Sequence, residues 1–131
     1  MEIKKIWANL GVQDLERTTT FYTALGFSSN GQSGELTSFV FSKDNFIIHF
    51  FLQQVLSQAI KAEMADLQKG NEVIFTLGTE TKSEIDIWAQ KVEAAGGTLI
   101  SKPETFGNNY YGFVFADPDG HRFNFFSLEG M

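Results

Sequence analysis

The sequence has 131 residues, of which 43% are hydrophobic and 20% are charged, so it fits one folded domain and excludes a disordered chain. Its 16 acidic and 10 basic residues give a formal net charge of −6, which excludes a broad basic surface for nucleic acid. It has no cysteine, which excludes disulfides and thiolate sites, and no apolar run long enough for a membrane span or secretory signal. We therefore predict a cytoplasmic protein.

The first half of the sequence predicts a strand, a helix and further strands. Residues 5–12 alternate with period two, which is typical of a strand with one buried face. Asp14 predicts the N-cap of a helix that ends at Gly26. Residues 28–35 have the composition of a turn, and the aromatic-rich stretches "LTSFVF" and "NFIIHFFL" predict two strands joined by a hairpin loop.

The second half repeats this order. Residues 53–70 carry apolar side chains at helical spacing and predict a connecting helix. The stretch "EVIFTL" predicts a strand, and Ser83 with Asp86 predicts the capping box of a helix that ends at Gly96. "TLIS", "YGFVFA" and "HRFNFF" predict three more strands, with "DPDG" as a type I turn before the last one.

These elements predict an α+β fold made of two βαβββ modules within one domain. The domain spans residues 1–131. Module one covers residues 4–52, the connecting helix 53–70 and module two 71–128.

Three stretches, "ANLGVQDLERTTTFYTALGF", "EVIFTLGTETKSEIDIWAQKVEAAGG" and "DPDGHRFNFF", together span nearly the whole chain. With them the sequence resembles a lactoylglutathione-lyase-like member of the glyoxalase, bleomycin resistance protein and extradiol dioxygenase superfamily, also called the vicinal oxygen chelate fold. The resemblance implies that each module forms a curved, half-barrel mixed sheet whose concave face makes a cleft, and that the protein is a homodimer. It does not select a reaction, because such relatives include isomerases, lyases, epimerases, dioxygenases and metal-free antibiotic-binding proteins.

The resemblance also implies four positions for a metal site. Metal-dependent relatives carry His, Glu or Gln near the start of the first strand and on a late strand of each module, and the matching residues here are Trp7, His49, Glu72 and Asn124. An indole cannot bind a metal, and an amide is a weak neutral ligand where relatives typically carry Glu. We therefore expect no metal cofactor. The alternative is a divalent ion (Ni, Zn, Mn or Fe) held by His49, Glu72 and Asn124.

Strand alternation independently places the polar strand residues on one face. If Ile48 and Phe50 pack toward the helix, His49 faces the opposite side, and the same alternation separates Glu72 and Asn124 from their apolar neighbours. His49 and Glu72 are accordingly the tentative catalytic pair, in which the carboxylate would orient the imidazole for proton transfer. The structural alternative is a histidine that bonds to backbone and a carboxylate that reaches solvent.

The predicted ligand-binding residues are Trp7, Asn9, His49, Glu72, Tyr110 and Asn124. Trp7 would form a stacking wall for a planar ligand, or else belong to the core. Tyr110 and Tyr111 are predicted in a loop at the cleft mouth, where either hydroxyl contacts ligand or solvent, and His121 is predicted to be exposed.

Two functions from different classes follow, with a third beside them. The first is metal-independent binding or sequestration of a small molecule in an aromatic cleft, favoured by Trp7 and Asn124. The second is a divalent-metal-dependent or proton-transferring lyase, isomerase or dioxygenase of the glyoxalase type, favoured by His49 and Glu72. The third is a non-catalytic structural or regulatory partner protein whose cleft is filled by its own aromatic side chains.

Overall fold

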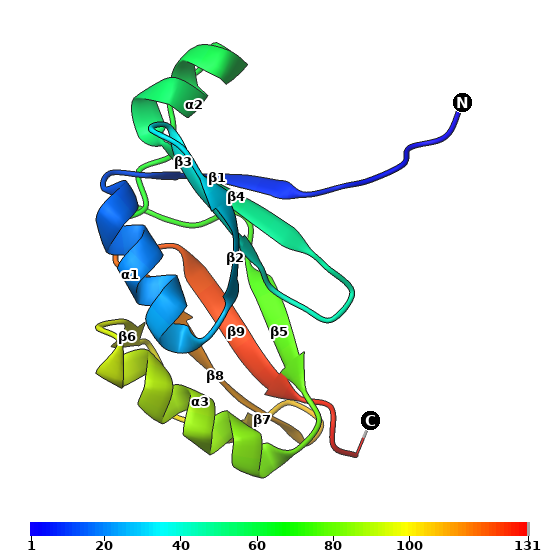
Figure 1. Ribbon diagram of the computed structural model, residues 1–131. Coiled ribbons are helices and arrows are strands. Elements are labelled where there is room, and N and C mark those ends of the chain that lie inside the picture. The colour runs from blue at the N-terminus through cyan, green and yellow to red at the C-terminus, as the bar shows by residue number, and fades with distance from the viewer. Residues whose placement is uncertain (131) are drawn as a thin grey trace. The chain divides into compact units, whose positions relative to one another are not determined.

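The computed structural model describes residues 1–130, which form two compact units, residues 1–64 and the residues from Ala65 onward. Each unit is a mixed sheet with a helix packed on one face (Figure 1). The predicted α+β fold with two βαβββ-type mixed sheets is confirmed, and neither sheet closes into a barrel within the described chain. No helix within residues 1–130 combines the length and apolar character needed to cross a lipid bilayer.

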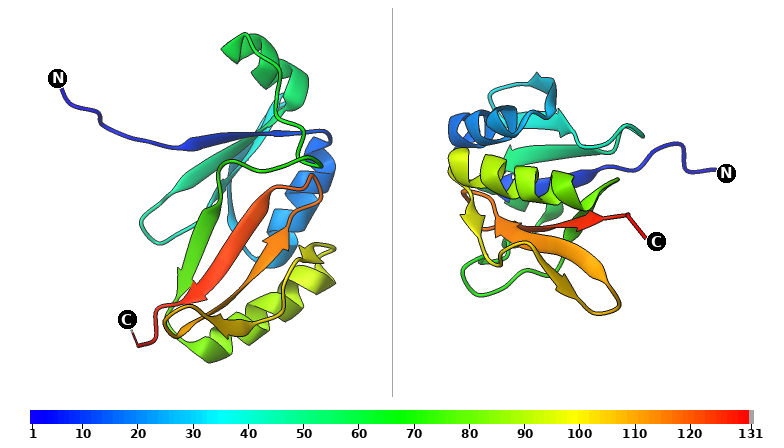
Figure 2. Two further views of the ribbon diagram at one scale, coloured as in Figure 1. Left: turned by 180° about the vertical axis from the view of Figure 1, so that it is seen from behind. Right: turned by 90° about the horizontal axis from the view of Figure 1, so that it is seen from below.

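The first unit has strand order β1-β4-β3-β2, with β1 parallel to β4 and the other pairs antiparallel. Residues 1–7 extend away from the start of β1, as both views in Figure 2 show. The elements of this unit are β1 (Ala8–Val12), α1 (Leu15–Leu25), β2 (Ser28–Gln32), β3 (Leu36–Val40), β4 (Ile47–Leu52) and α2 (Gln53–Ile60).

Helix α1 begins and ends as the sequence predicts. Asp14 is the N-cap, and its Oδ1 accepts a hydrogen bond from the backbone N–H of Arg17 at 3.0 Å. Gly26 ends the helix in the left-handed conformation, with φ of 96°. The helix buries Tyr22, whose ring stacks on Phe50 of β4 at 4.6 Å between centroids. This packing places α1 and the large rings on the same face of the sheet.

Two predictions for the first unit are wrong. Residues 28–32 are not a turn but the edge strand β2, exposed along its length, which takes its structure from backbone pairing with β3 and carries a bulge between Ser29 and Gly31. The connecting helix is also shorter than residues 53–70. It ends at Ile60 because Lys61 adopts the left-handed conformation and the Ser57 hydroxyl donates to the carbonyl of Ala62 at 2.6 Å.

The second unit has strand order β5-β9-β8-β6, with β7 also paired to β8. Its helix covers a core of stacked rings, and the half-buried ring of Trp88 lies on Phe125 at 4.7 Å between centroids. The elements are β5 (Phe75–Thr79), α3 (Lys82–Ala94), β6 (Thr98–Leu99), β7 (Glu104–Phe106), β8 (Tyr110–Ala116) and β9 (Arg122–Ser127).

The start of helix α3 differs from the prediction. Its capping box is formed by Thr81 and Glu84, not by Ser83 and Asp86. Asp86 instead accepts a hydrogen bond from the Tyr111 hydroxyl at 2.6 Å. That hydrogen bond is the main cause that raises the pKa of Tyr111, followed by burial and the charge of Asp86.

The turn before β9 has the predicted geometry. The backbone N–H of Gly120 donates to the carbonyl of Asp117 at 3.0 Å, and Asp117 Oδ1 accepts from the backbone N–H groups of Asp119 and His121. His121 is only 8% exposed, so the prediction that it is exposed is wrong.

Candidate functional site on the first sheet

A row of polar side chains crosses the face of the first sheet opposite α1. Asn9 on β1 is the register partner of His49 on β4, and His49 is the register partner of Ser38 on β3. Asn30 lies at the bulge of β2 and extends the row, since its side chain reaches Ser38. We call Asn9, His49, Ser38 and Asn30 the polar row. Register partners share one face of a sheet, so Asn9, His49 and Ser38 form a row across three strands, and the hydrogen bond to Ser38 adds Asn30 from the fourth.

Hydrogen bonds fix His49 within the polar row. Its Nδ1 lies 2.8 Å from the Ser38 hydroxyl oxygen, and the same oxygen accepts from Asn30 Nδ2 at 3.1 Å. Ser38 is only 1% exposed, whereas the His49 side chain is half-buried. Burial, and in second place the positive charge of Lys5, holds the pKa of His49 below its usual value. The imidazole therefore stays neutral near pH 7.

Aromatic rings border His49 on its open side. The indole of Trp7 meets the imidazole edge-on, with ring centroids 5.8 Å apart, and the ring of Phe51 does the same at 6.0 Å. Trp7 lies just before β1 and is 46% exposed. This exposure is against the interpretation of Trp7 as a core residue, because a buried indole would not leave nearly half of its surface in contact with solvent. An exposed indole beside a neutral imidazole can stack on a planar ligand and offer it a polar contact.

The open face of the second sheet carries two of the other predicted site residues. Asn124 on β9 is half-buried and its Nδ2 donates to the Thr76 hydroxyl at 3.3 Å. Tyr110 belongs to strand β8 and not to a loop, and its ring stacks at 6.0 Å on Phe126. Phe106 adds a third ring, 4.9 Å from Phe126. This face can make apolar and amide contacts.

Glu72 lies outside the sheet. Strand β5 begins at Phe75, three residues later than Glu72. The segment before it is held to the turn preceding β9 by side-chain hydrogen bonds of Asn71 and not by strand pairing. Asn71 donates to the carbonyl of Gly120 and accepts from the backbone N–H of Arg122, both at 3.2 Å. The prediction that a strand begins at Glu72 is therefore wrong, and its carboxylate is exposed.

The structure thus groups the predicted residues unevenly. Trp7, Asn9 and His49 lie together on the first sheet, Tyr110 and Asn124 lie together on the second, and Glu72 precedes the second sheet. Ser38 and Asn30 were not predicted. Ser38 follows the strand alternation of "LTSFVF", which was a usable signal, but Asn30 falls in a stretch whose composition resembles a turn.

The indole of Trp7 offers no ligand atom for a divalent ion, the Nδ1 of His49 lies 2.8 Å from the Ser38 hydroxyl oxygen, and Asn124 offers only a neutral amide oxygen, which is a weak ligand. Throughout residues 1–130, no group of three or more His, Asp or Glu side chains is arranged to hold a metal.

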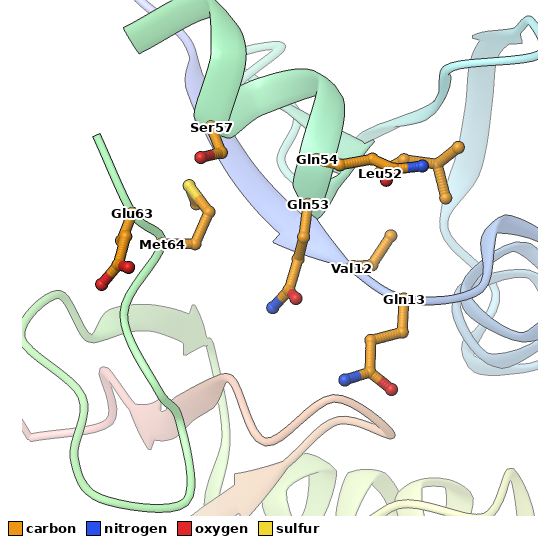
Figure 3. Close-up of a pocket in the computed structure, with 8 residues that line it drawn as sticks. All are labelled: Val12, Gln13, Leu52, Gln53, Gln54, Ser57, Glu63 and Met64. Atoms are coloured by element: carbon orange, nitrogen blue, oxygen red, sulfur yellow. The ribbon is translucent and has the colours of Figure 1, made fainter. Parts of the chain in front are cut away.

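A separate hollow of about 420 Å³ lies at the end of the first sheet, beside the start of α2. Figure 3 shows the amide side chains of Gln13 and Gln53 extending into the same open space. None of the predicted site residues lines this hollow, and it offers neither an imidazole nor an aromatic ring. We therefore build the functional argument on the polar row. The lining residues are Val12, Gln13, Leu52, Gln53, Gln54, Ser57, Glu63 and Met64.

Comparison with known proteins identifies the family. The model of the Glyoxalase/Bleomycin resistance protein/Dioxygenase superfamily matches residues 6–125. The chain belongs to this superfamily. A hypothetical protein from S. aureus is similar over 98% of this chain and 96% of its own, with 32% identity and a TM-score of 0.85. A search of curated proteins found no significant match.

Two more distant solved structures show likeness of fold alone. A lactoylglutathione lyase from Agrobacterium tumefaciens has 20% identity and a TM-score of 0.72, covering 98% of this chain and 96% of its own. A bleomycin-binding protein, solved with bleomycin, has 16% identity and a TM-score of 0.65, covering 97% of this chain and 100% of its own. The resemblance inferred from the sequence is confirmed at the level of the superfamily.

His49 should make the stability of the protein depend on pH. In the unfolded chain its pKa is about 6.5, whereas in the folded chain it is lower, so between these two values the unfolded state binds more protons. We expect the free energy of unfolding to decrease as the pH falls through about 6.5 and to level off below the folded pKa. Urea unfolding across this range should show a shallower decrease for His49→Gln, and equal pH profiles would contradict this role of the imidazole.

Proposed function

We propose that the protein binds a small planar molecule on the open face of the first sheet, without a metal cofactor and without chemistry on the ligand. The observation that carries this proposal is the exposed indole of Trp7 set edge-on against the imidazole of His49. Burying an exposed aromatic surface against a flat ligand is favourable, at about 25 cal/mol per Å² of apolar area. The neutral imidazole adds a directional hydrogen bond to that contact.

The chemistry of the substituted positions supports binding over metal catalysis. Indole and amide groups stand where the metal-dependent relatives carry His, Glu or Gln, and loss of charged ligands weakens a divalent site severely. The superfamily accommodates this function, since the bleomycin-binding protein of similar fold was solved with its ligand. Glu72, Tyr110 and Asn124 stay predicted ligand contacts, and the cytoplasmic location stays a prediction.

Ligand binding should change the fluorescence of Trp7. The sequence has two tryptophans, and the half-buried Trp88 stacks on Phe125 in the second unit, so the variant Trp88→Phe keeps Trp7 as the only indole reporter. We expect at least one member of a panel of planar aromatic compounds, including bleomycin, to change this fluorescence saturably. In calorimetry Trp7→Ala should weaken binding of that compound about tenfold or more, or about 1.4 kcal/mol.

The Trp88→Phe protein is the matched control for this loss, because it changes an aromatic side chain away from the exposed indole. It should bind the compound as tightly as the unaltered chain does. A panel in which no compound changes the Trp7 signal would contradict the proposal, as would equal affinities for Trp7→Ala and the unaltered chain.

We also propose that the protein is a homodimer in solution. The N-terminal segment exposes Ile3 and Ile6, which are 88% and 77% accessible, and exposed apolar side chains of this kind favour a protein partner. Light scattering at micromolar concentration should give twice the mass of 14.7 kDa for one chain. A mass of one chain under these conditions would contradict the dimer.

A further inference from the structure

The buried hydroxyl of Ser38 decides which nitrogen of His49 carries the proton. A serine hydroxyl has one proton to donate and accepts through its oxygen. Asn30 Nδ2 donates to this oxygen at 3.1 Å, and the second neighbour of the oxygen is His49 Nδ1 at 2.8 Å. Ser38 is 1% exposed, so water does not replace either partner.

The proton of Ser38 therefore goes to His49. Within residues 1–130 the Ser38 hydroxyl has hydrogen bonds with Asn30 and His49 alone, and Asn30 points its amide nitrogen, a donor, at the hydroxyl. If His49 donated from Nδ1 instead, the hydroxyl proton would be buried without an acceptor, which costs about 1–3 kcal/mol. One arrangement leaves no buried proton without an acceptor. In it Asn30 donates to Ser38, Ser38 donates to Nδ1 of His49, and the imidazole proton lies on Nε2.

The protonated Nε2 is available to a ligand. No described residue bonds to it, and it is not among the fully buried atoms. The same proton disfavours metal binding, since a histidine that ligates through Nε2 needs a lone pair there and usually donates from Nδ1 to its own partner. Here Nδ1 accepts. In His49 the donating nitrogen is thus Nε2 and the accepting nitrogen is Nδ1, which is the reverse of a histidine that binds a metal through Nε2.

We propose that His49 is a fixed hydrogen-bond donor that selects planar ligands with a carbonyl or carboxylate oxygen placed at the edge of the Trp7 indole. This inference rests on the proposed function and narrows its ligand class. The indole and the imidazole, 5.8 Å apart, provide the stacking surface and the donor within the span of one aromatic compound. Asn30 and Ser38 act as positioning residues, because they set the tautomer of His49 without contacting the ligand.

The tautomer can be measured directly in the full-length protein. Long-range ¹H–¹⁵N NMR distinguishes protonated from unprotonated ring nitrogens, and comparison with His49→Gln assigns the signals of His49 and His121. Above pH 7 we expect Nε2 of His49 to be protonated and Nδ1 to be unprotonated. Signals that show the proton on Nδ1 would overturn the inference.

The substitution Asn30→Asp is an isosteric test of the same hydrogen-bond chain. A carboxylate only accepts, so it would take the Ser38 proton, and Ser38 would then accept from Nδ1. We expect the His49 proton to move from Nε2 to Nδ1 in this variant. Asn30 is exposed on an edge strand, so the variant should fold. Ser38→Ala gives a second readout, since it should leave a mixture of both tautomers. An unchanged Nε2 proton in both variants would refute the role of the chain.

The ligand class is tested with 2-acetylnaphthalene and 2-isopropenylnaphthalene, which share a shape but differ in one acceptor oxygen. NMR shifts of the Trp7 indole report binding. We expect the protein to bind the ketone at least threefold more tightly than the alkene. In His49→Phe this preference should disappear. Equal binding of both compounds at Trp7 would overturn the inference while leaving the proposed function intact. If neither compound shifts the Trp7 signal, the proposed stacking site itself fails.

Discussion

The hydrogen bonds of one buried hydroxyl organise the open face of the first sheet. Ser38 joins β2 to β4 through side chains, with Asn30 on one side and His49 on the other. Because β3 separates these two strands, the chain of donors runs across the sheet and not along a strand. The orientation of the imidazole beside Trp7 depends on this crossing, whereas its lowered pKa comes from burial and from the charge of Lys5.

The pairing of strands explains why such a chain can form here. The parallel register of β1 with β4 places Asn9 beside His49, and the antiparallel register of β3 with β4 places Ser38 on the other side. Helix α1 requires large rings on the opposite face, where Tyr22 and Phe50 are fully buried. Strand alternation then leaves the polar side chains together on the face opposite α1. The alternation of side chains along the strands therefore produces both the buried aromatic core and the polar row.

The parts of the fold that depend on local signals could be predicted from the sequence. The N-cap at Asp14 and the stop at Gly26 follow from chemistry within one turn of the chain, and the alternation around His49 assigned its face. The edge strand β2 was missed because its pairing with β3 overrides a turn-like composition. The start of β5 was missed because the side-chain bonds of Asn71 span about fifty residues of sequence, which local patterns do not contain. The link from Asn30 to Ser38 was missed for the same reason.

Membership in the superfamily accounts for the fold, and the proposed function rests on the exposed indole of Trp7 beside the imidazole of His49. The central claim is that this chain retains the fold but recognises its ligand with an indole and a neutral imidazole in place of a metal ion. Isothermal titration of the full-length protein with Ni, Zn, Mn and Fe(II) tests this claim most directly. The account predicts no stoichiometric binding at micromolar metal. Stoichiometric micromolar binding of any of these ions that disappears in His49→Gln would contradict it.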